Sequence, residues 1–154
     1  MLSPEERKAH NTQFWNGFKL LMRRHNTKTR RGVNWLKYPT DIKHVYLRLH
    51  CDNLGAFVHF DFQFKDSSVR EIVWEQMQEL KVVMEKEMGS QGIWTRDLIA
   101  PEGFVFDRIS WENRTLNYYH REEWNTIYAF LKERLLAFDR FYQEFKDVLI
   151  LLVE

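Results

Sequence analysis

An α+β fold is predicted for this chain, with a mainly antiparallel sheet built from two hairpins and packed against three helices. Two stretches, 44–65 and 93–111, alternate apolar and polar residues around short turns, which is typical of half-buried hairpin strands. Three other stretches repeat apolar residues at helical spacing. The predicted order is helix, two strands, helix, two strands and a long helix, in a single domain spanning residues 1–154.

The first hairpin has a register that its own pattern fixes. Asp52-Asn53-Leu54-Gly55 supplies the turn, because Asn and Gly tolerate positive φ. On the apolar face, the pairs are then Cys51 with Ala56, Leu49 with Val58, Leu47 with Phe60 and Val45 with Phe62. On the polar face, they are His50 with Phe57, Arg48 with His59, Tyr46 with Asp61 and His44 with Gln63. A slip of one residue would mix the two sets.

The polar face of this hairpin leaves three interpretations open. A solvated face is normal for one side of an antiparallel sheet. The hydrogen-bonding groups on it also fit a binding surface for a ligand or partner, with Arg48, His50, His59 and Asp61 as candidate residues. The third is a metal site of His50, His59 and Asp61, since the two histidines would be diagonal neighbours roughly 7–8 Å apart. No metal-ligand motif occurs elsewhere, so the sequence assigns no metal and no cofactor.

Capping signals mark the predicted helices. Ser3 and Ser68 are each followed three residues later by Glu, which predicts two helix starts. Gly89 predicts the end of the second helix.

The second hairpin is predicted from strands 93–99 and 104–111 around a four-residue loop. If that loop sets the register, Arg96 lies opposite Asp107 and Trp94 lies opposite Ile109.

Composition indicates a globular protein that is neutral overall. A net charge of +1 argues against a protein that coats nucleic acid by charge alone. Cys51 is the one cysteine, so no internal disulfide can form, and a cytoplasmic location is expected. Its place on the apolar face predicts a buried structural thiol. The charged N-terminus does not resemble a signal peptide, and no apolar run reaches the ~18 residues of a membrane span.

Positive charge is concentrated between Lys19 and Lys43. That stretch holds eight basic residues and one acid. Basic side chains interleaved with aromatic rings suit phosphate contact and base stacking, so one interpretation is an anionic partner such as nucleic acid. The alternative is a solvated loop whose Trp35 is anchored in the core. The candidate binding residues are Arg23, Arg24, Lys28, Arg30, Arg31, Trp35 and Lys37.

No signature of an active site is present: there is no glycine-rich phosphate loop, nucleophile elbow or cysteine pair. We therefore expect a non-enzymatic binding or accessory module and assign no catalytic residue. One enzymatic alternative stays open, because a helix, a hairpin and a second helix also follow one another in restriction-endonuclease-like nucleases. Such enzymes hold a divalent metal with acids beside a lysine. Gln63-Phe64-Lys65 would be a variant of their acid-x-Lys tripeptide, with Asp52 or Asp61 as the other acid.

The last helix is the longest predicted element. Its apolar residues keep helical spacing from Trp124 to Leu149. A helix of roughly 30 residues is about 45 Å long, whereas a typical strand is about 20 Å long. The helix must therefore bend, dock on the first helix or bury its excess against a second copy. The second case predicts a homodimer through Phe138, Phe141, Tyr142 and Phe145.

Several aromatic positions resemble those of one uncharacterised bacterial family. They are Phe14-Trp15 with Phe18, Asn34-Trp35 before the first strand, Trp94 in the third strand and Trp124 at the last helix. The resemblance covers nearly all of the chain from Phe14 to Phe145, and the family is a domain of unknown function. Its members stand alone or follow restriction-endonuclease-like nuclease domains. The resemblance thus implies a DNA-related setting and transfers no functional residue.

Overall fold

The computed structural model describes residues 2–25 and 32–154 and confirms the α+β class. One antiparallel sheet has the order β1-β2-β4-β3. Its strands are β1 (Val45–Asp52), β2 (Gly55–Phe62), β3 (Ile93–Ile99) and β4 (Val105–Asn113). The α-helices are α1 (Pro4–Met22), α2 (Ser67–Glu79), α3 (Lys81–Met88) and α4 (Trp124–Val153). The described residues also form two short 3-10 helices, η1 (Trp35–Lys37) and η2 (Arg121–Glu123).

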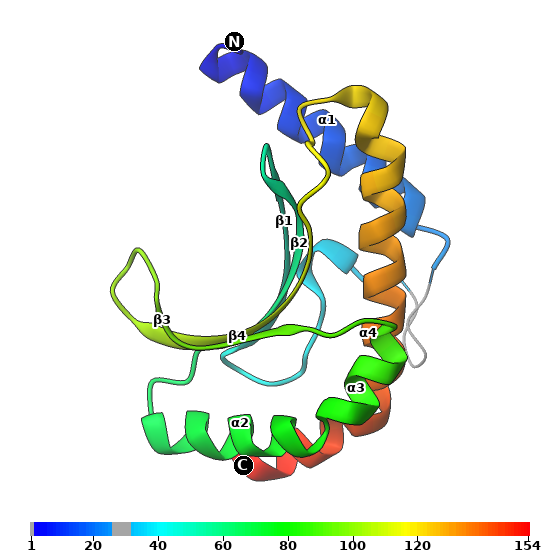
Figure 1. The fold of residues 1–154 in the computed structure, drawn as a ribbon. Helices are drawn as coiled ribbons and strands as arrows, with labels where there is room; N and C mark the ends of the chain where they lie inside the picture. Colours follow the sequence, from blue (N-terminus) through cyan, green and yellow to red (C-terminus); the bar gives the residue numbers. More distant parts are fainter. Residues whose placement is uncertain (1, 26–31) are drawn as a thin grey trace.

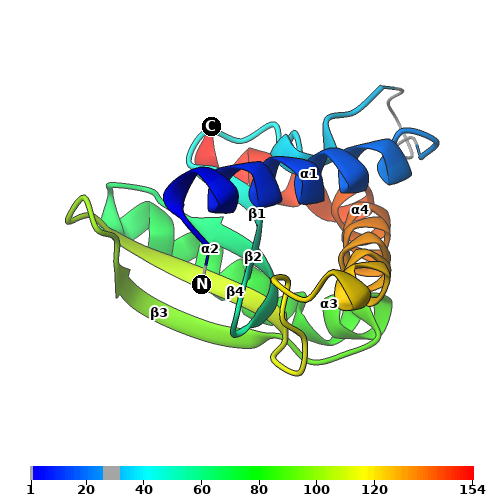
Figure 2. The same cartoon turned by 90° about the horizontal axis from the view of Figure 1, so that it is seen from above.

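The sheet is strongly curved and its two faces have different surroundings. Figure 1 shows α2, α3 and α4 on the convex side, and none of the described helices packed on the concave side. Seen from above, α1 crosses beside the β1 edge of the sheet (Figure 2). Core contacts match this arrangement, since Phe60 meets Phe138 of α4 with ring centroids 4.8 Å apart. The other face of each strand therefore lines the concave side.

The first hairpin has the predicted register throughout. Cys51 pairs with Ala56 and Val45 with Phe62, and the polar pairs between them also match. Beyond the ladder, the Gln63 amide donates to the His44 carbonyl at 2.7 Å. Cys51 is 7% exposed, which confirms the buried thiol, and burial raises its pKa to about 12.

The second hairpin matches the prediction only in part. Trp94 pairs with Ile109 as predicted, but the ladder shifts between Thr95 and Leu98, so Arg96 and Asp107 are not ladder partners. Their side chains still form an ion pair, with Arg96 Nη2 3.6 Å from Asp107 Oδ2. A β-bulge absorbs one extra residue there. The fully buried Asp107 stabilises it, because its Oδ1 accepts the Asp97 amide at 2.9 Å.

The second predicted helix is divided into α2 and α3, so the described residues form four α-helices rather than three. Leu80 separates them, and Gly89 ends α3 in the left-handed conformation as predicted. The break lets α2 lie along the sheet while α3 turns toward α4 (Figure 1). The predicted cap is wrong by two residues, since Asp66 accepts the Ser68 amide. At α1 the predicted capping box of Ser3 and Glu6 is confirmed.

The long helix α4 bends around the convex side of the sheet (Figure 1). The bend keeps its apolar stripe inside one chain: Phe138, Phe141 and Tyr142 are each at most 1% exposed, and Phe145 packs against the same core. These aromatic side chains are thus covered without a second copy. Among the described residues, no helix is long and apolar enough to cross a membrane.

Candidate binding surfaces

The concave side of the sheet displays the polar face that the hairpin pattern predicts. Strand pairing extends that face across β4 in three rows of side chains. The rows are Tyr46, Asp61 and Arg108; Arg48, His59 and Ser110; and His50, Phe57 and Glu112. We call these nine residues, with Phe106 and Arg114 at the two ends, the open face. It brings all four of the predicted hairpin residues together with β4 residues that no pattern had singled out.

A bidentate ion pair fixes the centre of the open face. Arg108 Nε and Nη2 donate to the two carboxylate oxygens of Asp61 at 2.7 and 3.0 Å. The Asp61 side chain is 1% exposed and that of Arg108 is 28% exposed. Such fork geometry holds both groups in place.

Three arginines of the open face lie on aromatic rings. The guanidinium carbon of Arg48 is 4.2 Å from the Tyr46 ring centroid, that of Arg108 is 5.0 Å from Phe106, and that of Arg114 is 5.2 Å from Phe57. Stacking on a ring orders a guanidinium and leaves its outer plane and N–H edge free for other contacts.

His59 occupies the middle of the open face as a neutral ring. Burial, together with the charge of Arg108, lowers its pKa to about 4. The other histidine of the face is engaged differently, since His50 Nε2 lies 2.9 Å from Asp52 Oδ2. With Asp61 held by Arg108, the described residues assemble no metal site from His50, His59 and Asp61. That interpretation of the polar face is therefore wrong.

A second surface lies at the C-terminal end of α1. Lys19, Arg23 and His25 line one hollow there with Trp35. The pKa of His25 is lowered by burial and by the charges of Lys132 and Arg24. We call Lys19, Arg23, Arg24 and Lys132 the basic end. Within the described ranges, 2–25 and 32–154, none of the four forms an ion pair with a carboxylate.

The other predicted residues of the basic stretch fall into three groups. Lys37 is exposed on η1, next to the hollow. Trp35 is only 4% exposed and its indole N–H donates to the His25 carbonyl at 2.9 Å. Its ring anchors the segment in the core and is not available for base stacking, so the alternative interpretation holds for this residue. Lys28, Arg30 and Arg31 lie outside the described residues.

The nuclease constellation is not assembled. Lys65 is exposed and pairs with no carboxylate among the described residues, while Asp61 is bound by Arg108. Asp52 sits at the turn, opposite Gly55. Gln63 therefore lies about eight residues, or roughly 25 Å, along the hairpin from that turn. The acids and the lysine cannot share one metal.

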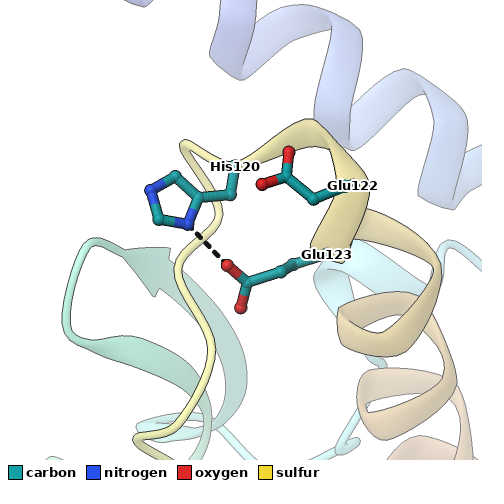
Figure 3. A group of neighbouring side chains, drawn as sticks. All are labelled: His120, Glu122 and Glu123. Atoms are coloured by element: carbon teal, nitrogen blue, oxygen red, sulfur yellow. Dashed lines mark hydrogen bonds and ion pairs between the residues drawn. The ribbon is translucent and has the colours of Figure 1, made fainter.

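One group that the sequence did not single out could accept a divalent metal. Ligand atoms of His120, Glu122 and Glu123 lie within 4.8 Å of one another at the start of α4 (Figure 3). Two of its members already have structural partners. His120 Nδ1 is 2.6 Å from Glu123 Oε2, and Glu123 Oε1 accepts the Asn117 amide at 3.2 Å. These two hydrogen bonds give the group a structural role, because they hold the connection that leads into α4 in place.

Comparison with known proteins supplies a family and no activity. No curated protein and no solved structure matches the chain significantly. A family model described as a domain of unknown function, DUF4268, matches residues 11–146. This range includes every strand of the sheet and most of α1 and α4, so the chain belongs to the DUF4268 family.

Proposed function

We propose that the domain is a non-enzymatic, cytoplasmic binding module that associates with nucleic acid through the basic end. The observation that carries this proposal is the set of four cations around His25 without a carboxylate partner among the described residues. Like charges gathered around one hollow repel one another, and a bound anion relieves this repulsion. A phosphate backbone is such an anion and is bound chiefly through contacts of this kind.

The environment of His25 supports a positive potential at this end. Lys132 on α4 and Arg24 after α1 both disfavour the protonated ring, in addition to its burial. In the sequence, Lys28, Arg30 and Arg31 follow Arg24 within seven positions. The exposed side chains of Lys19, Arg23 and Arg24, with the half-buried Lys132, suit sequence-independent contact with phosphates.

Fluorescence anisotropy with labelled oligonucleotides tests the proposal. Binding should weaken steeply as salt is raised, and the Arg23→Gln/Arg24→Gln variant should reduce the slope of log affinity against log salt by about 2. The matched control is Arg7→Gln/Lys8→Gln, which removes the same charge from the opposite end of α1. The control should bind like the wild type.

Two results would count against the proposal. One is the absence of any binding at low salt. The other is an equal loss of affinity in both double variants, which would show that only net charge matters and that the basic end is no specific surface.

A further inference from the structure

The open face offers a different kind of contact from that of the basic end. Its charges are mostly paired within the chain: Arg108 with Asp61, Arg114 with Glu112 and His50 with Asp52. Among the described residues, Arg48 is the one cation of the open face without a carboxylate partner. Charge alone therefore gives this face little attraction for a polyanion. A ligand would be bound here through the shape of the face and through stacking on its planar groups.

The outer layer of the open face consists of flat, polar groups lying over aromatic rings. The side chains of His50 and Arg114 are 55% and 62% exposed, and the Arg48 guanidinium is ordered by the Tyr46 ring. His50 and His59 flank Phe57, with ring centroids 5.7 and 5.8 Å apart from it. Guanidinium and imidazole planes of this kind are surfaces on which nucleobases stack.

Base planes are accessible only in unpaired nucleic acid. In a duplex each base is stacked between its neighbours, and proteins read the base edges from the grooves instead. A concave sheet of four strands is also too broad for a groove that admits one helix or a two-stranded ribbon. An extended single strand can lie across the sheet with its bases on the planar groups and a phosphate beside Arg48.

We infer that the open face is a second nucleic-acid contact, which takes unpaired bases and makes a single strand the preferred partner of this domain. The inference rests on the proposed function, because it presumes that nucleic acid is bound. The two surfaces lie on different sides of the sheet and act independently. The basic end holds phosphates of either form, and Arg48, His50 and Arg114 add stacking for single strands alone.

A charge-conserving variant separates stacking from electrostatics. Arg48→Lys/Arg114→Lys keeps both positive charges and removes both guanidinium planes. Its affinity for an oligo-dT of about 15 nucleotides should fall about tenfold, the usual scale for the loss of a base stack. Its salt slope, and its affinity for a duplex of equal length, should stay as in the wild type. Arg121→Lys is the matched control, since Arg121 stacks on Trp124 outside the open face, and it should bind normally.

The outcomes distinguish this inference from the proposed function. The open face does not take bases if the wild type binds single strands and duplex with equal affinity. The same conclusion follows if the double lysine variant keeps its affinity for both, or loses affinity for both by the same factor. In these cases the basic end remains the attachment site. If the wild type binds neither form at low salt, the proposed function fails and this inference with it. Thermal unfolding of each variant confirms that the fold is intact.

Discussion

Asp61 and Arg108 face each other across β2 and β4 and form two parallel hydrogen bonds, 2.7 and 3.0 Å long. The carboxylate is almost completely buried although none of the helices that the structure describes packs on this side of the sheet. The ion pair engages the Asp61 carboxylate, which a nuclease would need to bind its metal. It also holds Arg108 beside Phe106 and His59. This ion pair therefore determines which groups at the centre of the concave side are free to bind a ligand.

Breaking this pair from the acid side should destabilise the fold. Asp61→Asn leaves Arg108 without its counter-ion, which typically costs about 3–5 kcal/mol at a fully buried pair. Because Arg108 keeps some access to water, we expect a loss of about 2 kcal/mol in the free energy of unfolding, measured in urea. Glu87→Gln, which breaks the exposed pair with Arg140, should cost less than about 1 kcal/mol. Equal losses in the two variants would contradict this account of Asp61.

His59 should make stability depend on pH in the acid range. Its folded-state pKa is about 4, against 6.5 for an ordinary histidine. The unfolded chain therefore gains a proton at a higher pH than the folded one, so the contribution is complete above pH 6.5 and is lost as pH falls toward 4. The full shift corresponds to about 3 kcal/mol, and partial exposure of the ring reduces this to about 1–2 kcal/mol.

The difference between wild type and His59→Gln isolates this effect. Urea unfolding between pH 4 and 7 should show wild type losing more stability than the variant across that window. A direct check is the NMR titration of the His59 ring, whose midpoint should lie near 4. A midpoint near 6.5 would overturn both expectations.

The features that depended on local pattern were predictable from sequence. Alternation of apolar and polar residues determined every pair of the first hairpin, because a slip would expose Phe60 and Phe62. Gly89 and the Ser3 capping box also follow from neighbouring residues alone. The division of the second helix did not, since no glycine or proline marks Leu80 and the break depends on how α3 meets α4.

The open face was only half predictable. Its hairpin half, from Tyr46 to Asp61, follows from alternation, but nothing local indicates that β4 pairs with β2 and brings Arg108 beside Asp61. Long-range strand order has no signature in a single sequence. The same limit applies to Trp35. Its basic neighbours in the sequence suggested a stacking role, whereas in the structure its ring is buried and its indole N–H donates to the His25 carbonyl.

The aromatic residues of α4 should contribute to stability within one chain. Phe141→Ala removes a side chain that is 1% exposed, which typically costs about 3–5 kcal/mol. Leu152→Ala, on the same helix but 37% exposed, should cost less than about 1 kcal/mol. Urea unfolding midpoints measured at two protein concentrations show whether these side chains stabilise one chain alone or also an assembly of two copies. An unchanged midpoint is expected, and a midpoint that rises with concentration would indicate that the helix also joins two copies.

Gly55 should be irreplaceable at the tip of the first hairpin. Its φ of 153° is rare for residues with a side chain, and an added Cβ would lie 2.5 Å from the Asn113 carbonyl oxygen and 3.0 Å from the Arg114 Cα. Backbone atoms cannot move aside as a flexible side chain can, so Gly55→Ala should cost about 3 kcal/mol. For a chain of this length, that corresponds to a fall of about 9 °C in Tm.

Gly103→Ala provides the comparison that separates crowding from backbone strain. Gly103 also has a positive φ, 94°, but an added Cβ would meet no atom within 4 Å. The substitution should therefore cost only about 1 kcal/mol, or about 3 °C in Tm. If the two alanine variants melt at the same temperature, the close approach of β4 to the hairpin tip is not what requires glycine at position 55. The larger loss at Gly55 is expected because its added Cβ would press on the backbone of Asn113 and Arg114, whereas none would press on the backbone near Gly103.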